Sequence, residues 1–232
     1  MSPESQRNVL LEVASLSMRL ARKYVEPDSH RNSPQNFTQA QLLSCLILRA
    51  YLKTTYRGLI EILGVSDGLR DTLGLRSLPH DSTLKRFADR SSVLEVIDAM
   101  LLELVRQCDG DSPEEAAIDA TGMETTSASA HYLTRSGKRR SKYVKLSVCV
   151  MAGSLLPSSV VASWGPNNDK ADAPELLARA STVSQRKKLF GDVGYDAEWG
   201  EEFCRDDWQV ESIIKLAVHR SNGRQNSTYV RE

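Results

Sequence analysis

The chain has 232 residues, of which 41% are hydrophobic, and its 30 basic side chains balance 30 acidic ones. This length and apolar content suffice for one substantial core, or for one core with a small helical satellite. Because its charges balance, the chain lacks the net positive charge that many nucleic-acid-binding proteins carry. Because there is no uncharged apolar run of about 18 residues and no secretory signal pattern, the sequence predicts a cytoplasmic protein without a membrane span.

The first part of the chain, residues 1–110, has the periodicity of helices. Helices are predicted over Asn8 to Tyr24, after a capping box at Thr38-Gln-Ala-Gln41, and from Thr54 or Thr55 to Gly64. The stretch from Gly64 to Pro79 is rich in turn-forming residues. This region is therefore predicted to be all-helical.

A short basic helix is predicted after Pro79, with Asp81 or Ser82 as its N-cap, and a longer helix follows from about Val93 to Cys108. The short helix carries the candidate DNA-binding residues Lys85, Arg86 and Arg90. Short helices joined by tight turns are compatible with a helix-turn-helix module that reads DNA. An ordinary helical bundle with exposed basic residues explains the same pattern.

The periodicity changes after the linker-like residues 109–113, and residues 111–232 read as an α/β domain. The pattern predicts strands at 116–119, 143–151, 158–163, 189–192 and 210–215, with a helix capped by Asp172 and another capped by Asp196. Strands that alternate with helices in this order predict a mixed α/β sheet flanked by helices.

Two aspartates, Asp119 and Asp192, each end a short apolar run and meet a turn that contains glycine. Carboxylates at strand ends can share divalent metal, and hard oxygen ligands favour Mg²⁺ or Mn²⁺ over zinc. Taken singly, Asp119 can instead be a turn residue that bonds nearby backbone amides, and Asp192 can be a cap at a strand-to-helix junction.

A basic strip lies between His131 and Lys145 and contains no acidic residue. Its members are Arg135, Lys138, Arg139, Arg140, Lys142 and Lys145. A solvated hairpin whose cations protect an edge strand accounts for such a run. Because the strip follows Asp119 closely, it can equally hold a phosphate backbone within reach of that carboxylate.

Several segments together resemble the DDE transposases of bacterial insertion sequences, whose catalytic domain has the RNase H-like fold. The N-terminal region of that family is similar to FTQAQLLSCLILRAYLKTTYRGLIEIL and SLPHDSTLKRF, and its catalytic sheet to AIDATGMETT, YVKLSVCV, NNDKADAPELL and GDVGYDAEW. The resemblance implies that Asp119 and Asp192 are the first two catalytic acids and that they bind Mg²⁺ or Mn²⁺. It also implies double-stranded DNA as partner, at element ends and target sites, and allows two protomers to pair on DNA.

The resemblance fails at the third acid, which in the family is a glutamate on a long helix after the fifth strand, near a tyrosine, an arginine and a lysine. Here Tyr229-Val-Arg231-Glu232 has a different spacing and the chain stops. Glu211 has no neighbours that match either. The sequence therefore predicts that the C-terminal helix and the catalytic glutamate are missing, and that a transposase of this length is impaired.

Two other functions stay open on the sequence. One is a non-catalytic DNA-binding remnant that competes with a full-length transposase for element ends. The other is a metal-dependent nuclease or hydrolase in which Cys204 or His219 acts as nucleophile or base, although no Ser/His/Asp or Cys/His signature supports it. The four cysteines are widely spaced and form no Cys-x-x-Cys pair, so they are predicted to be reduced and mostly packing residues.

Overall fold

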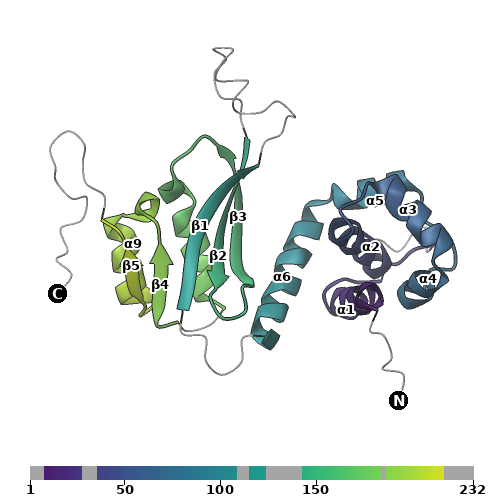
Figure 1. The fold of residues 1–232 in the computed structure, drawn as a ribbon, viewed down its shortest axis with the longest axis horizontal. Helices are drawn as coiled ribbons and strands as arrows, with labels where there is room; N and C mark the ends of the chain where they lie inside the picture. The colour runs from purple at the N-terminus through teal and green to yellow at the C-terminus, as the bar shows by residue number, and fades with distance from the viewer. Residues whose placement is uncertain (1–7, 28–35, 109–114, 124–142, 184–185, 217–232) are drawn as a thin grey trace, which may run out of the picture. The chain divides into compact units, whose positions relative to one another are not determined.

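The computed structural model describes residues 8–27, 36–108, 115–123, 143–183 and 186–216 (Figure 1). The chain divides into two compact units, Met1–Met100 and Leu101–Glu232. Helix α6 (Ser91–Cys108) contains the boundary between them. Among the described residues, no helix is long and apolar enough to cross a membrane.

The first unit is built from helices. They are α1 (Val9–Tyr24), α2 (Gln39–Tyr51), α3 (Tyr56–Val65), α4 (Asp67–Leu73), α5 (Asp81–Ala88) and the start of α6. The capping box predicted before α2 is confirmed: Thr38 Oγ1 accepts from the Gln41 amide at 3.2 Å, and Gln41 Oε1 accepts from the Thr38 amide at 2.9 Å. Helix α1 packs on α2 and α4, and α5 packs on α2 and α3.

Helix α4 lies within the turn-rich stretch between Gly64 and Pro79. Its N-cap, Ser66, makes no side-chain capping bond. Leu69 and Leu73 are buried, α4 packs against α1, and Gly74 ends the helix in the left-handed conformation. A seven-residue helix is marginal alone, and tertiary packing of its apolar side stabilises it here.

Helix α5 also differs at its start from the prediction. His80 is the N-cap, and its Nδ1 accepts from the Ser82 amide at 3.2 Å, whereas Asp81 is already helical. The acidic side chain of Asp81 still lies in the first turn, where the helix dipole favours negative charge. Leu84 and Phe87 are buried, which leaves the basic residues of α5 on its exposed side.

The second unit contains a five-stranded mixed sheet, as the sequence predicts. Its strands are β1 (Glu115–Met123), β2 (Tyr143–Met151), β3 (Pro157–Gly165), β4 (Lys188–Gly191) and β5 (Glu211–Ile214). Their order across the sheet is β3-β2-β1-β4-β5. Strands β1, β2 and β3 pair antiparallel, whereas β1, β4 and β5 run parallel to one another. Connections through helices permit the two parallel pairings.

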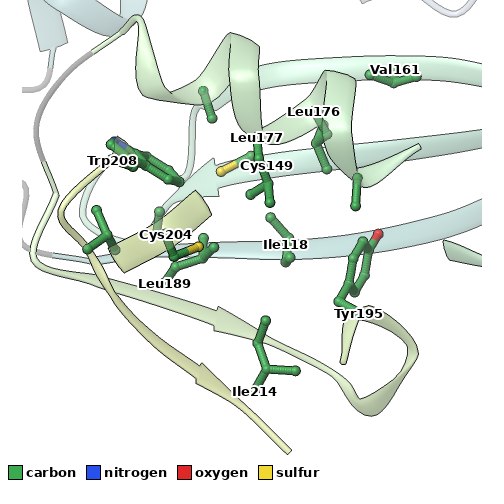
Figure 2. Packing of buried hydrophobic residues seen from close by; sticks show 14 residues of the cluster. Ile118, Cys149, Val161, Leu176, Leu177, Leu189, Tyr195, Cys204, Trp208 and Ile214 are labelled. Carbon is green, nitrogen blue, oxygen red and sulfur yellow. The ribbon is translucent and has the colours of Figure 1, made fainter. Parts of the chain in front are cut away.

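One face of this sheet is covered by helices and carries the core (Figure 2). Leu176 and Leu177 of α8 (Ala173–Ser181) pack over Ile118 and Cys149, whose side chains point to this face. The short segments η2 (Val193–Tyr195), α9 (Glu198–Glu202) and η3 (Phe203–Asp207) follow β4, and Tyr195, Cys204 and Trp208 join the same cluster. Alternation along each strand therefore turns the intervening residues to the opposite face.

Candidate functional site

Asp119 lies on the sheet face opposite the core. Ala116 and Ile118 on the same strand are buried, whereas Asp119 is exposed and pairs with Val148 of β2. The prediction that it ends its strand is wrong, because β1 continues to Met123 along β2. With respect to β4, however, the pairing stops at Ile118 opposite Gly191. Asp119 is therefore the first β1 residue beyond the parallel partner.

Asp192 directly follows β4 and begins the segment η2. Its side chain caps that segment, because Oδ1 accepts from the Gly194 amide at 2.9 Å. Asp192 is exposed and its backbone is extended, so it continues the direction of β4. Asp192 therefore has the capping role that the sequence offered as an alternative to metal binding. The cap uses one of its two carboxylate oxygens.

The register of β1 and β4 brings the two aspartates to one place. Ile118 and Gly191 are the last residues paired between these parallel strands, and Asp119 and Asp192 come immediately after them. Adjacent strands of a sheet are about 4.8 Å apart. The two carboxylates are thus neighbours by topology, although 73 positions separate them in number.

The donor set suits a hard cation. Asp119 Oδ1 accepts from the Ala120 amide at 2.7 Å, and Asp192 Oδ1 accepts from Gly194, so in the described part of the chain each Oδ2 has no hydrogen bond. Neither carboxylate forms an ion pair within that part. Exposed carboxylate oxygens without a protein cation are ligands that Mg²⁺ and Mn²⁺ accept. Among the described residues, no group of three or more His, Cys, Asp or Glu is placed to hold a metal.

Tyr195 shows that negative charge gathers at this end of the sheet. Burial of its ring raises the pKa of the phenol, the Ser147 hydroxyl lowers it, and the charges of Asp169, Asp119 and Asp192 raise it by smaller amounts. A nearby anion disfavours a phenolate, so all three carboxylates act on the same small region.

Glu211, the acid that the sequence does not favour as a third ligand, lies at the other end of the sheet. It opens β5 and pairs with Lys188, at the start of β4, whereas Asp192 follows the end of β4. Because strands rise about 3.3 Å per residue, four residues separate the two levels by about 13 Å. Glu211 therefore does not share a metal ion with Asp192. Glu232 lies outside the described residues.

Two predicted caps are wrong in the role of their side chains. Asp172 is at the N-cap position of α8 but makes no capping bond; its side chain is buried and accepts from Ser147 and Ser163 instead. Asp196 is fully buried, and Ala197 takes the N-cap position of α9. The Asp172 carboxylate is buried, and a buried carboxylate without partners is costly. It therefore bonds to serines on the sheet and not to the backbone amides of its own helix.

Lys145 corrects the interpretation of the basic strip as a solvated run. Its side chain is only 4% exposed, and its Nζ lies 2.8 Å from Asp169 Oδ1 and 3.1 Å from Asp172 Oδ2. Sequence reasoning missed this buried ion cluster. The alternation of β2 points the other way, because its regularly spaced apolar residues, such as Val144 and Leu146, lie on the face opposite the one that the structure buries with Lys145. Arg135, Lys138, Arg139, Arg140 and Lys142 lie outside the described residues.

The three candidate DNA-binding residues on and just after α5 are exposed, and each makes a contact within the unit. Lys85 Nζ pairs with Asp89 Oδ2 at 2.7 Å, Arg86 Nε donates to the Ser82 carbonyl at 3.2 Å, and the Arg90 guanidinium lies 5.2 Å from the Phe87 ring. Such contacts are weak at an exposed surface. With Asp81 and Asp89 adjacent, α5 is a mixed rather than strongly basic surface.

Cys204 does not fit the role of a nucleophile. It is 1% exposed, and burial raises the pKa of its thiol to about 12, so the reactive thiolate is scarce at neutral pH. Cys45 and Cys149 are buried too, and Cys108 is exposed; all four cysteines are free, as predicted. His219 lies outside the described residues.

Comparison with known proteins adds no family: the sequence matches no protein-family model and no curated protein.

Proposed function

We propose that this chain is a transposase-type protein that processes double-stranded DNA with a divalent metal ion bound by Asp119 and Asp192. The observation that carries the proposal is their placement. Two exposed carboxylates follow the last paired residues of adjacent parallel strands, and no ion pair occupies them in the described part of the chain. The resemblance of the surrounding segments to DDE transposases supplies the substrate class.

The sheet supports an RNase H-like domain. In this proposal β1, β2 and β3 form the antiparallel half, and β4 and β5 extend the sheet in parallel on the other side of β1. The central strand β1 then carries the first acid and its parallel neighbour leads to the second. Ligands of open α/β sheets bind at the carboxyl ends of parallel strands; Asp192 follows the carboxyl end of β4, and Asp119 follows the last β1 residue that pairs with β4.

The residues present fit Mg²⁺ or Mn²⁺ in donor chemistry, and Asp119 and Asp192 would each offer an oxygen. A metal ion bound there would activate a water or hydroxyl nucleophile and stabilise the leaving oxygen of a phosphodiester. Two carboxylates can hold one metal ion but are too few to fix two metal ions, because a metal pair needs more protein ligands. We therefore expect metal binding with weak strand cleavage by this chain.

The first test is Mn²⁺ binding, followed by electron paramagnetic resonance of the free ion. The 232-residue protein should bind Mn²⁺, and Asp119→Asn and Asp192→Asn should each weaken binding at least about tenfold, since each removes one charged ligand. Glu211→Gln is the matched control, because it removes an exposed acid from the distant end of β5. Equal binding by wild type and both aspartate variants would exclude the site.

The second test separates catalysis from DNA binding alone. Supercoiled plasmid incubated with the protein and Mn²⁺ should be nicked slowly, and Asp119→Asn should abolish the nicking. Binding to a labelled duplex, measured over a series of salt concentrations, should weaken as salt rises. Nicking that persists in Asp119→Asn and Asp192→Asn would come from a contaminating nuclease. Together with duplex binding that needs no metal, this result would favour the non-catalytic DNA-binding alternative.

A further inference from the structure

The covered face of the sheet contains a buried ion cluster, here called the Lys145 cluster, which consists of Lys145, Ser147, Ser163, Asp169 and Asp172. Lys145 pairs with both aspartates, and Asp172 Oδ2 also accepts from the Ser147 hydroxyl at 2.9 Å and the Ser163 hydroxyl at 3.0 Å. The cluster therefore ties β2, β3 and the start of α8 to the short segment η1 (Asp169–Ala171).

Stability alone does not account for such a cluster. Desolvating a lysine and a carboxylate costs several kcal/mol per ion, and apolar residues of similar size often stabilise a core at least as well. Lys145 is 3% exposed and Asp172 is 6% exposed, so both charges are desolvated. A buried ion pair does, however, fix the position of each partner, because neither charge tolerates separation.

Asp169 connects this cluster to the candidate metal site. One of its oxygens, Oδ1, contacts Lys145, and the other, Oδ2, lies 2.7 Å from the point where a Cβ on residue 194 would stand. That same point is 3.0 Å from Asp192 Oδ1. Gly194 thus lies between the two carboxylates, and its lack of a side chain allows Asp169 to approach the turn directly.

The backbone of this turn is also what orients Asp192. The Gly194 amide donates to Asp192 Oδ1, so a displacement of Gly194 moves the carboxylate that would bind metal. Asp169 is placed by Lys145 and by the η1 segment, whose N-cap Asn168 accepts from the Lys170 amide at 3.2 Å. A chain of contacts therefore runs from Lys145 through Asp169 and Gly194 to Asp192.

We infer that Lys145 and Asp169 are positioning residues for Asp192. Lys145 neutralises and holds Asp169, which packs against Gly194 and keeps the Asp192 turn in place. The inference rests on the proposed role of Asp192 as a metal ligand. Residues that support metal ligands typically change metal affinity by about 10- to 100-fold when they are replaced.

The decisive experiment compares Mn²⁺ affinity in Lys145→Met and Asp169→Asn. The first variant removes a positive charge and the second removes a negative one, so a purely electrostatic effect tightens binding in Lys145→Met and weakens it in Asp169→Asn. A positioning role weakens binding in both, by about tenfold. Lys145→Arg, which keeps the charge, should recover most of the affinity. Opposite shifts in the two variants would overturn the inference.

A second readout needs no metal, so it tests the positioning inference separately from the proposed function. The amide resonance and hydrogen exchange of Gly194 report whether its bond to Asp192 persists. We expect faster exchange at Gly194 in Lys145→Met and Asp169→Asn, at a temperature where circular dichroism shows each variant folded. Unchanged Gly194 exchange in both would overturn the inference even if Asp192 binds Mn²⁺. Changed exchange without Mn²⁺ binding in the wild type would overturn the metal site alone.

Discussion

At the residue scale, burial decides which cysteines react. Burial raises the pKa of Cys45 to about 12 and that of Cys149 to about 11, and Cys204 behaves like Cys45. A thiol with a raised pKa stays protonated near pH 8, and a buried one is also inaccessible to reagents. Cys108, at the end of α6, is the exposed cysteine.

We expect Cys108 to be the single fast-reacting thiol when the native protein is treated with Ellman's reagent at pH 8. Replacing it by serine should remove the fast phase and leave the three slow thiols. In denaturant, all four cysteines should react at similar rates, and the absorbance change then gives the signal expected for four thiols. Two or more fast thiols in the native wild type would contradict the burial of Cys45, Cys149 and Cys204.

At the element scale, Gly191 permits the close approach of β4 to its neighbours. A Cβ at this position would lie 3.0 Å from Ile118 Cγ1 and 3.2 Å from Ile214 Cγ1. Both isoleucines belong to the core cluster, so there is little room for them to move. The residue before Asp192 is therefore small because the sheet packs tightly there.

Gly191→Ala should accordingly lower the free energy of unfolding by about 1–3 kcal/mol, the usual cost of overpacking a core. Urea unfolding followed by circular dichroism measures the change. Gly153→Ala is the matched control, because a Cβ there meets nothing within 4 Å, and it should change stability by less than about 0.5 kcal/mol. Similar losses in the two variants would show that steric crowding at β4 is not the cause.

At the scale of the whole molecule, the Lys145 cluster predicts how stability depends on pH. Burial raises the pKa of Asp172, but hydrogen bonds from Lys145, Ser147 and Ser163 and the charge of Lys145 lower it more, so the net shift is downward. Burial lowers the pKa of Lys145, but hydrogen bonds and charges from Asp169 and Asp172 raise it above its usual value. Both shifts favour the charged, paired state.

A depressed carboxyl pKa contributes stability above about pH 3.9, and this is lost as the pH falls through the folded-state value. A raised lysine pKa contributes stability below about pH 10.4, and this is lost as the pH rises through the folded-state value. The free energy of unfolding should therefore fall on both sides of a broad plateau. Asp172→Asn should flatten the acid limb in urea titrations, whereas the exposed Asp71→Asn should leave it unchanged.

Local patterns in the sequence sufficed to place most elements of the sheet unit. The strand Tyr143–Met151 was predictable to the residue because apolar and polar positions alternate along it, and the capping box at Thr38 because its two partners are three residues apart. The transposase function stays a prediction from resemblance. The sequence also singled out Asp119 and Asp192, but not the reason that they are neighbours.

Only the tertiary structure decided which residues lie together. The β1–β4 register aligns Asp119 with Asp192, packing on α1 stabilises the short helix α4, and partners on other elements draw Lys145 and Asp172 into the interior. The physical reason is the range of the interactions. Caps and alternation depend on neighbours a few residues away, whereas parallel pairing and the burial of charge depend on partners that only the folded chain brings within contact distance.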